Sequence, residues 1–200
     1  MYNVHVAVIK NIGIGVINME YSFYKFEKNA IERFLALDKY KYIIEEKNKC
    51  NISTNKEYQK TFNRFFMIRR DERWRKIYYT YFEQIKNKKD ITFQEIIKYL
   101  YNKTGNIEAS FSSKMLAIIN PNMPIWDQYI ISNLELKVEG KDKKERLNNT
   151  ICIYNEIMKE EKELLKRQDI QQSIKEFKDK YNDYKLTDIK ILDYLLWNNR

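Results

Sequence analysis

The sequence predicts a mainly α-helical protein, an irregular bundle of eight or nine helices, and three observations support this fold class. Only four Gly and two Pro occur in 200 residues, too few for the many turns of a β-sandwich or barrel. Apolar residues recur at helical spacing through most of the chain. A hydrophobic share of 44% is ample for a packed core, so a single domain is expected over residues 1–200.

The N-terminal segment is the exception to the helical pattern. Val and Ile alternate on both sides of a Lys-Asn-Ile-Gly turn within residues 1–19, which predicts a short strand or β-hairpin. Met19 is an alternative natural start for the chain. In that case the residues before it are an appendage.

Four helices are predicted between Tyr21 and Gly105. Helical spacing predicts a long helix from Tyr21 to about Lys47, and two aromatic-rich helices follow it. A fourth begins with the capping box Thr92-Phe-Gln-Glu95, in which the first and last residues cap each other's backbone amides. Gly105 is expected to end that helix, because Gly adopts the left-handed conformation without steric cost.

The second half of the chain predicts the remaining helices. A short helix is expected over residues 110–120, ended by Pro121, and Asp127 is a plausible N-cap for a helix over residues 128–136. A long helix is expected over residues 143–166. The last two are indicated by apolar residues at helical spacing, namely Ile170, Ile174, Phe177 and Tyr181, and then Ile189, Leu192, Leu195 and Leu196.

The acidic residues of the long helix are predicted to be solvent-exposed. The segment Met158-Lys-Glu-Glu-Lys-Glu-Leu alternates carboxylates with lysines. That pattern is typical of a solvated helix exterior and does not indicate an acid/base pair.

No metal or cofactor is predicted. Cys50 and Cys152 are far apart and the chain has a single His, His5, so no zinc or iron–sulfur ligand set is available. The two thiols are expected to be free. No run of about 18 apolar residues predicts a membrane span, and the N-terminus lacks the features of a signal peptide, which indicates the cytoplasm.

The net charge of +9 is concentrated in the first half of the chain. Residues 1–100 hold 20 Lys/Arg against 12 Asp/Glu and so carry +8 of it. A basic group stands out, and Arg69, Arg73 and Lys76 are expected on one helical stripe. Either this group binds nucleic acid, with DNA favoured, or it is a solvated face with salt bridges to neighbouring acids. Its members are Arg64, Arg69, Arg70, Arg73 and Lys76.

The stretch from Phe111 to Asp127 holds the candidate catalytic residues. Lys114 interrupts an apolar helix, where lost hydration is expected to lower its pKa. Asp127 follows a rigid Pro-x-x-Pro-Ile-Trp segment, at a helix N-terminus that favours an ionised carboxylate. An amine and a carboxylate are therefore expected to meet in one hollow, with Phe111 and Trp126 as apolar walls.

This arrangement resembles the catalytic region of helix-hairpin-helix DNA glycosylases. The lysine-bearing helix, the short connector and the Pro-Ile-Trp-Asp step that opens a second helix are most similar to the archaeal 8-oxoguanine type, over residues 108–134. The resemblance implies that Lys114 attacks C1′ of a flipped nucleotide and forms a Schiff base. It also implies that Asp127 stabilises the cationic sugar. The family's hairpin usually reads L-P-G-[IV]-G, and residues 106–113 lack those glycines.

Two other interpretations remain open from the sequence. Lys114 and Asp127 are alternatively a structural ion pair, which leaves a non-catalytic DNA- or RNA-binding protein, such as a phage-defence or mobile-element accessory. The third interpretation is a protein-interaction module, with the helices over residues 143–183 as its docking surface.

Overall fold

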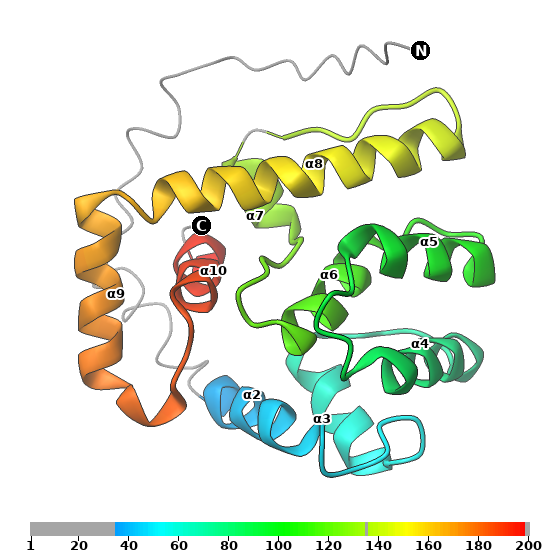
Figure 1. Cartoon of the computed structure of the whole chain (residues 1–200), viewed down its shortest axis with the longest axis horizontal. Helices are drawn as coiled ribbons and strands as arrows, with labels where there is room; N and C mark the ends of the chain where they lie inside the picture. Colours follow the sequence, from blue (N-terminus) through cyan, green and yellow to red (C-terminus); the bar gives the residue numbers. More distant parts are fainter. Residues whose placement is uncertain (1–34, 135, 199–200) are drawn as a thin grey trace.

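The computed structural model describes residues 35–134 and 136–198, and this part of the chain is mainly α-helical without any strand (Figure 1). The predicted fold class is therefore confirmed. The expected N-terminal strand or hairpin, and the first part of the helix expected from Tyr21, lie outside the described residues. In order, the elements are α2 (Leu35–Glu46), α3 (Lys56–Phe65), α4 (Glu72–Ile85), α5 (Phe93–Thr104), α6 (Ala109–Ile119), α7 (Gln128–Asn133), α8 (Lys143–Leu164), α9 (Gln168–Lys180), the 3₁₀ turn η2 (Asn182–Tyr184) and α10 (Asp188–Asn198).

The helices form two groups with a connector between them. Helices α2 to α6 pack in sequence, α2 on α3, α4 on α5 and α5 on α6. Helix α8 crosses the top of Figure 1, α9 turns down at its end, and α10 returns to the middle, where it contacts α7 and α9. The segment that joins α6 to α7 passes between these groups, so residues from both can reach it.

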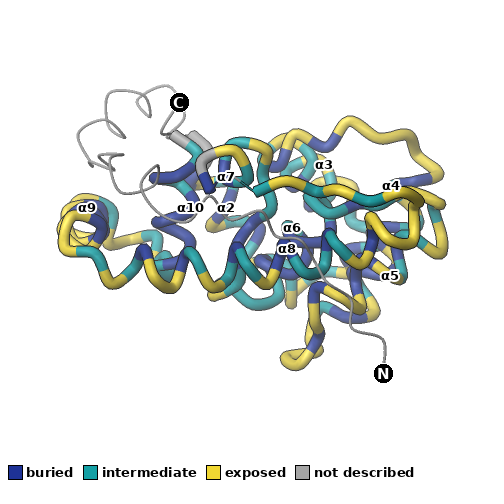
Figure 2. The backbone as a smooth tube through the Cα atoms, turned by 90° about the horizontal axis from the view of Figure 1, so that it is seen from above, coloured by how far each residue is buried: buried dark blue, intermediate teal, exposed yellow. Residues whose placement is uncertain are grey.

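The first group is held together by aromatic packing. Phe62 has no exposed surface, and its ring centroid lies 4.7 Å from that of Phe66 and 5.6 Å from that of Phe82. Full burial of such a side chain contributes about 1.5–3 kcal/mol. The inward sides of these helices are buried and their outward sides exposed (Figure 2), as the helical spacing predicted.

The helix ends confirm several capping predictions. Thr92 and Glu95 form the capping box of α5, and Gly105 ends that helix at φ 72°. The Asp127 carboxylate accepts from the backbone N–H of Tyr129 and caps α7. At the C-terminus of α6, the Lys47 amine donates to the carbonyl oxygen of Ile118 at 2.6 Å. This places a cation at a helix C-terminus, where it is stabilised by the last carbonyl groups.

Helix α7 is shorter than the expected 128–136. It ends at Asn133: the N–H of Leu134 still makes the α-helical bond to the carbonyl oxygen of Ile130, but that of Leu136 reaches Ile131. The second bond spans five residues, so the chain widens into a turn there and leaves the α-helical path.

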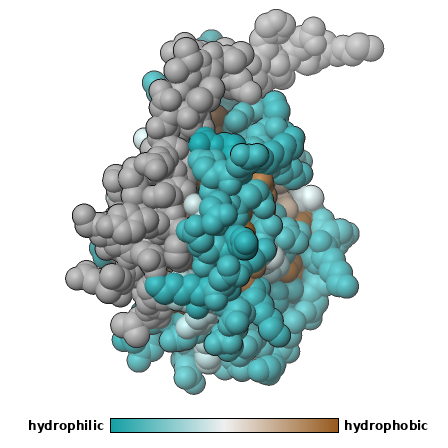
Figure 3. Space-filling model, turned by 90° about the vertical axis from the view of Figure 1, so that its left-hand side faces the viewer, coloured by the Kyte–Doolittle hydropathy of each residue, from teal (hydrophilic) through white to brown (hydrophobic). Residues whose placement is uncertain are grey.

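Two surface features concern possible partners. None of the helices in the described residues is both long and apolar enough to cross a membrane. The side of the molecule that carries α9 presents a mostly hydrophilic surface where it is described (Figure 3). The outward residues of α9 are Gln, Lys, Asp and Glu, whereas Ile170, Ile174 and Phe177 face the core.

Candidate functional site

Lys114 lies on α6 with its amine surrounded by aromatic carbon. The Nζ atom lies 5.4 Å from the ring centroid of Phe111 and 5.9 Å from that of Phe66. Its hydrogen bond is a long one, 3.4 Å to the carbonyl oxygen of Phe66. The side chain is partly buried. This burial lowers the pKa of Lys114, as the sequence predicted; the charge of Asp127 opposes the effect and that of Lys190 adds to it.

Asp127 faces the same region from the N-terminus of α7. The residue before it, Trp126, donates its backbone N–H to the hydroxyl of Ser113 at 2.8 Å. Ser113 is the neighbour of Lys114 on α6, so this bond fixes the start of α7 against the helix that carries the lysine. The Trp126 ring lies nearly parallel to that of Phe93, with centroids 6.5 Å apart.

Lys114 and Asp127 are near each other but not paired. The Asp127 charge raises the pKa of Lys114, yet no ion pair within 4.0 Å joins these two described residues. Both side chains are partly buried and therefore retain contact with solvent. A closed salt bridge would hold the amine in its protonated form and occupy the carboxylate, and neither group is held in that way here.

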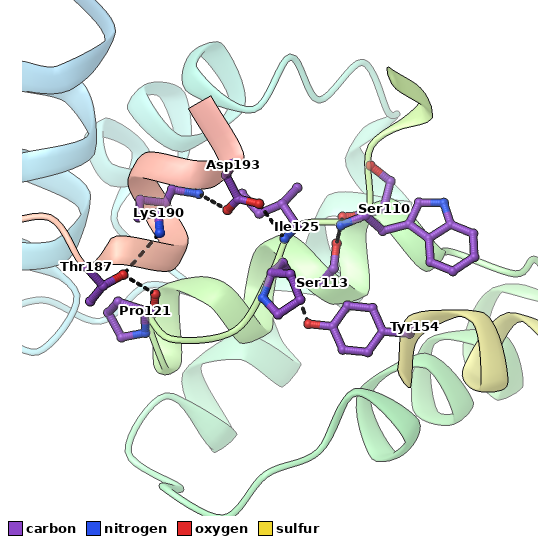
Figure 4. Close-up of polar contacts among 10 residues, drawn as sticks. Ser110, Ser113, Pro121, Ile125, Tyr154, Thr187, Lys190 and Asp193 are labelled. Atoms are coloured by element: carbon purple, nitrogen blue, oxygen red, sulfur yellow. Dashed lines mark hydrogen bonds and ion pairs between the residues drawn. The ribbon is translucent and has the colours of Figure 1, made fainter. Parts of the chain in front are cut away.

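The connector to Asp127 is anchored by side chains from two distant helices (Figure 4). Thr187, which precedes α10, donates to the carbonyl oxygen of Pro121 at 2.6 Å. Asp193 of α10 accepts from the backbone N–H of Ile125 at 3.2 Å. From α8, the Tyr154 hydroxyl donates to the carbonyl oxygen of Pro124 at 2.8 Å. These bonds satisfy backbone groups that would otherwise be buried without partners.

A buried charged cluster stands behind this connector. Lys190 and Asp193 are 2% and 4% exposed and form an ion pair of 3.1 Å. Glu161 of α8 has no exposed surface, and neither of its side-chain oxygens has a hydrogen-bond partner. The prediction of a solvated exterior is therefore wrong for Glu161, because α8 turns this position into the core although lysines flank it in sequence.

Burial sets the charge state of that cluster. Desolvation raises the pKa of Glu161 well above its ordinary value, and the nearby Asp193 carboxylate raises it further. Desolvation also raises the pKa of Asp193, while Lys190 opposes the rise. One lysine faces two carboxyl groups, so Lys190 pairs with Asp193 and the unpartnered Glu161 keeps its proton.

The side chains of the basic group differ in whether they form an ion pair. Arg64, Arg69, Arg73 and Lys76 are exposed, and none forms an ion pair within 4.0 Å in the part of the chain that the structure describes. The salt bridges to Asp71 and Glu72 allowed by the sequence are not formed; instead, the Asp71 side chain caps α4. The expected single stripe is wrong for Arg69, because α4 begins only at Glu72.

Arg70 has a structural partner. Its Nη2 lies 2.8 Å from a carboxylate oxygen of Glu108, which is 3% exposed and also accepts from the indole N–H of Trp74 at 3.0 Å. The guanidinium lies over the Phe111 ring, 5.2 Å from its centroid. Because Lys114 lies over the same ring, the basic segment and the candidate catalytic lysine belong to one region.

Met67 belongs to no sequence motif, yet its exposure and its backbone conformation are both unusual in the structure. Its side chain is 63% exposed, and its backbone has φ 53°. It lies between Arg64 and Arg69 and directly follows Phe66, whose carbonyl oxygen meets Lys114. Met67 is therefore an exposed apolar side chain between cations that form no ion pair in the described residues.

The residues that anchor the connector were also missed as site residues. No local pattern links Thr187 to Pro121, 66 positions away, or Asp193 to Ile125, 68 positions away. The one available signal was the Lys190-x-x-Asp193 spacing on an otherwise apolar helix. Because buried charges are usually paired, this spacing indicates a buried ion pair.

No group of three or more His, Cys, Asp or Glu side chains converges as in a metal site within the described residues. Cys50 and Cys152 are both free thiols. Comparison with protein-family models, characterised proteins and solved structures found no match to this chain.

Proposed function

We propose that this protein binds DNA with the segment from α3 to α4 and acts on a nucleotide turned out of the duplex, with Lys114 and Asp127 as its catalytic residues. The observation that carries the proposal is the state of Lys114. Its amine is desolvated, has a lowered pKa and lies near a carboxylate with which it forms no ion pair. A lysine in that state is an activated nucleophile.

The chemistry follows from the two groups. The neutral amine of Lys114 attacks C1′ of the sugar and the bond from C1′ to the base breaks, so the base leaves with the bonding electrons and takes up a proton from water. The Asp127 carboxylate accepts the proton that the attacking nitrogen loses and stabilises the positive charge that develops at the sugar. The nitrogen lone pair then forms a C=N bond as the C1′–O4′ bond breaks, and O4′ takes up the remaining nitrogen proton, which opens the sugar ring and gives an imine between Lys114 and C1′.

The surface around the lysine supports a nucleic-acid partner. Four exposed cations without ion pairs, Arg64, Arg69, Arg73 and Lys76, flank the segment that contacts Lys114. Unpaired arginine and lysine side chains gain from phosphate contacts because they release the counterions of DNA. Such a role agrees with the cytoplasmic location expected from the sequence.

Borohydride trapping tests the proposal. Duplex oligonucleotides that carry 8-oxoguanine, uracil, hypoxanthine, an alkylated adenine or an abasic site are incubated with the protein, and borohydride reduces the imine to a stable amine. We expect an adduct with at least one substrate, lost in Lys114→Gln and strongly reduced in Asp127→Asn. Lys98→Gln is the matched control, since Lys98 is exposed on α5. No adduct and no released base across the panel would remove the catalytic claim.

Binding without chemistry is the second candidate, and the unpaired cations favour it independently of Lys114. In that case the protein retains DNA with an affinity that falls steeply with salt, and Asp127→Asn has no effect on retention. Retained DNA without an adduct would select this function. Failure to retain DNA, together with salt-insensitive capture of a protein partner, would favour the interaction module.

A further inference from the structure

We propose that Thr187 and Asp193, together with Tyr154, are positioning residues for Asp127: the C-terminal helix and α8 hold the connector in the one path that presents the Asp127 carboxylate to Lys114. The inference rests on the proposed function for its purpose. The positioning itself is a property of the protein without DNA and is tested without it.

The geometry points to the backbone of the connector. Each of the three side chains bonds a backbone group between Pro121 and Ile125, and none bonds Asp127 itself. The nearest of these bonds, from the N–H of Ile125 to Asp193, is two residues before Asp127. The connector therefore acts on the Asp127 carboxylate together with the bond from Trp126 to Ser113, which holds the start of α7 against α6.

The anchors are themselves rigidly held. Lys190 pairs with Asp193, and the backbone N–H of Lys190 donates to the Thr187 hydroxyl at 3.2 Å, so one turn of α10 binds both ends of the connector. The Tyr154 ring stacks on Phe93 with centroids 3.8 Å apart. Groups held in place by packing and by their own hydrogen bonds fix the position of a site residue more narrowly than the loop could alone.

The charged groups that face this region come from several helices. Asp127 and Lys190 act on Lys114, and Asp127 also acts on Asp193. Glu161 and Tyr154 from α8, Tyr40 from α2 and Tyr194 from α10 are titratable groups that also interact electrostatically with Asp193. A substitution at Asp193 or Lys190 would change these charges directly. The decisive variants are therefore those at Thr187 and Tyr154, which change no charge.

The experiment measures the pKa of the Lys114 amine in the intact protein without DNA, from the pH dependence of its acylation followed by mass spectrometry. Thr187→Val and Tyr154→Phe each delete one bond to the connector and keep nearly the same shape. Thr187→Val also removes the acceptor of the Lys190 N–H at the start of α10, so Tyr154→Phe is the cleaner deletion. We expect Asp127→Asn to lower the pKa of Lys114, because an opposite charge nearby is lost. Thr187→Val and Tyr154→Phe should lower the pKa of Lys114 by a smaller amount. Thr187→Ser keeps the hydroxyl and should leave this pKa as it is in the natural protein.

A double-mutant cycle separates positioning from general support of the fold. If Thr187 acts through Asp127, Thr187→Val lowers the pKa of Lys114 in the natural protein and has no further effect in the Asp127→Asn background. An equal fall in both backgrounds, or no fall in either, would overturn the inference. Tyr154→Phe decides the question if Thr187→Val does not fold, and Asp188→Asn on the same helix, which loses a surface pair with Lys178, should change nothing.

The inference and the proposed function can fail separately. A protein that forms no adduct with DNA but passes the cycle has a positioned Lys114–Asp127 pair without the proposed reaction. A protein that forms the adduct and fails the cycle performs the reaction without these anchors.

Discussion

Glu161 and Asp193 reach the same buried cluster from α8 and α10, and Lys190 is the cation that both carboxyl groups face. Asp193 forms the ion pair with Lys190 and accepts a hydrogen bond from the backbone N–H of Ile125. These contacts stabilise a negative charge on Asp193, whereas Glu161 has no such contact and favours its protonated form. A protonated, unpartnered carboxyl group in the core makes stability depend on pH in a direction that can be calculated.

Glu161 should make the protein less stable as the pH rises. Its pKa is raised in the folded state, so the unfolded chain loses this proton near the ordinary pKa of 4.5 while the folded protein keeps it. Between those two pKa values the folded state binds more protons, and the free energy of unfolding falls with pH by up to about 1.4 kcal/mol per pH unit from this group. Below pH 4.5 the loss disappears.

Glu161→Gln is therefore expected to remove this decline. Urea unfolding at pH 4 and pH 7 measures it: the variant should gain stability relative to the natural protein at pH 7 and little at pH 4. Glu163→Gln, at an exposed position on the same helix, is the matched control. A Glu161→Gln variant that loses equal stability at both pH values would contradict the assignment of the proton.

Met67→Gly should affect stability and DNA binding in opposite directions. At φ 53°, a residue with a side chain is strained and Gly is not, which favours the variant by about 0.5–1 kcal/mol after the greater chain entropy of Gly is counted. Loss of the exposed side chain should reduce DNA affinity by about tenfold, if it packs against bases or sugars. Thermal unfolding and filter binding measure the two effects.

Lys185→Gly is the matched control for Met67. Lys185 also has a positive φ, 47°, but it directly follows η2, which packs on α2 and α9. It should give a similar gain in stability with no tenfold loss of affinity. Unchanged DNA binding in Met67→Gly would exclude Met67 from the interface.

Arg70 and Arg73 lie three positions apart, and we expect Arg70 to support stability and Arg73 to bind DNA. Arg70→Ala leaves the buried Glu108 carboxylate with one partner fewer, which should cost about 1–3 kcal/mol of stability. Arg73→Ala should leave stability unchanged and reduce the slope of log affinity against log salt by about 0.9, as expected for one lost phosphate contact. Lys175→Ala on α9 is the control for a remote cation. Equal salt slopes for natural protein and Arg73→Ala would remove Arg73 from the interface.

Lys114 should react at lower pH than exposed lysines. Burial lowers its pKa, so the neutral amine accumulates at a pH where exposed lysines are still protonated. Competitive acylation followed by mass spectrometry should give a midpoint for Lys114 below that of Lys98. Asp127 opposes this shift, so Asp127→Asn should move the midpoint lower still. A midpoint at or above that of Lys98 would contradict an activated amine.

The sequence by itself determined the local structure of this protein. Caps and helix ends, such as the Thr92–Glu95 box, Gly105 and the Asp127 N-cap, depend on residues a few positions apart, and so does the helical spacing that predicts which faces are buried. The lowered pKa of Lys114 was also predictable, because an amine on an apolar helix loses hydration wherever that helix packs.

Only the tertiary structure decided which distant groups meet. The pairing of Asp193 with the backbone of Ile125, the burial of Glu161 among sequence neighbours that are lysines, and the commitment of Arg70 to Glu108 all depend on how helices cross. Local spacing describes one helix at a time and assigns no partner to its polar residues. Those partners are chosen when packing removes water, since each buried charge then needs a counter-charge or a proton.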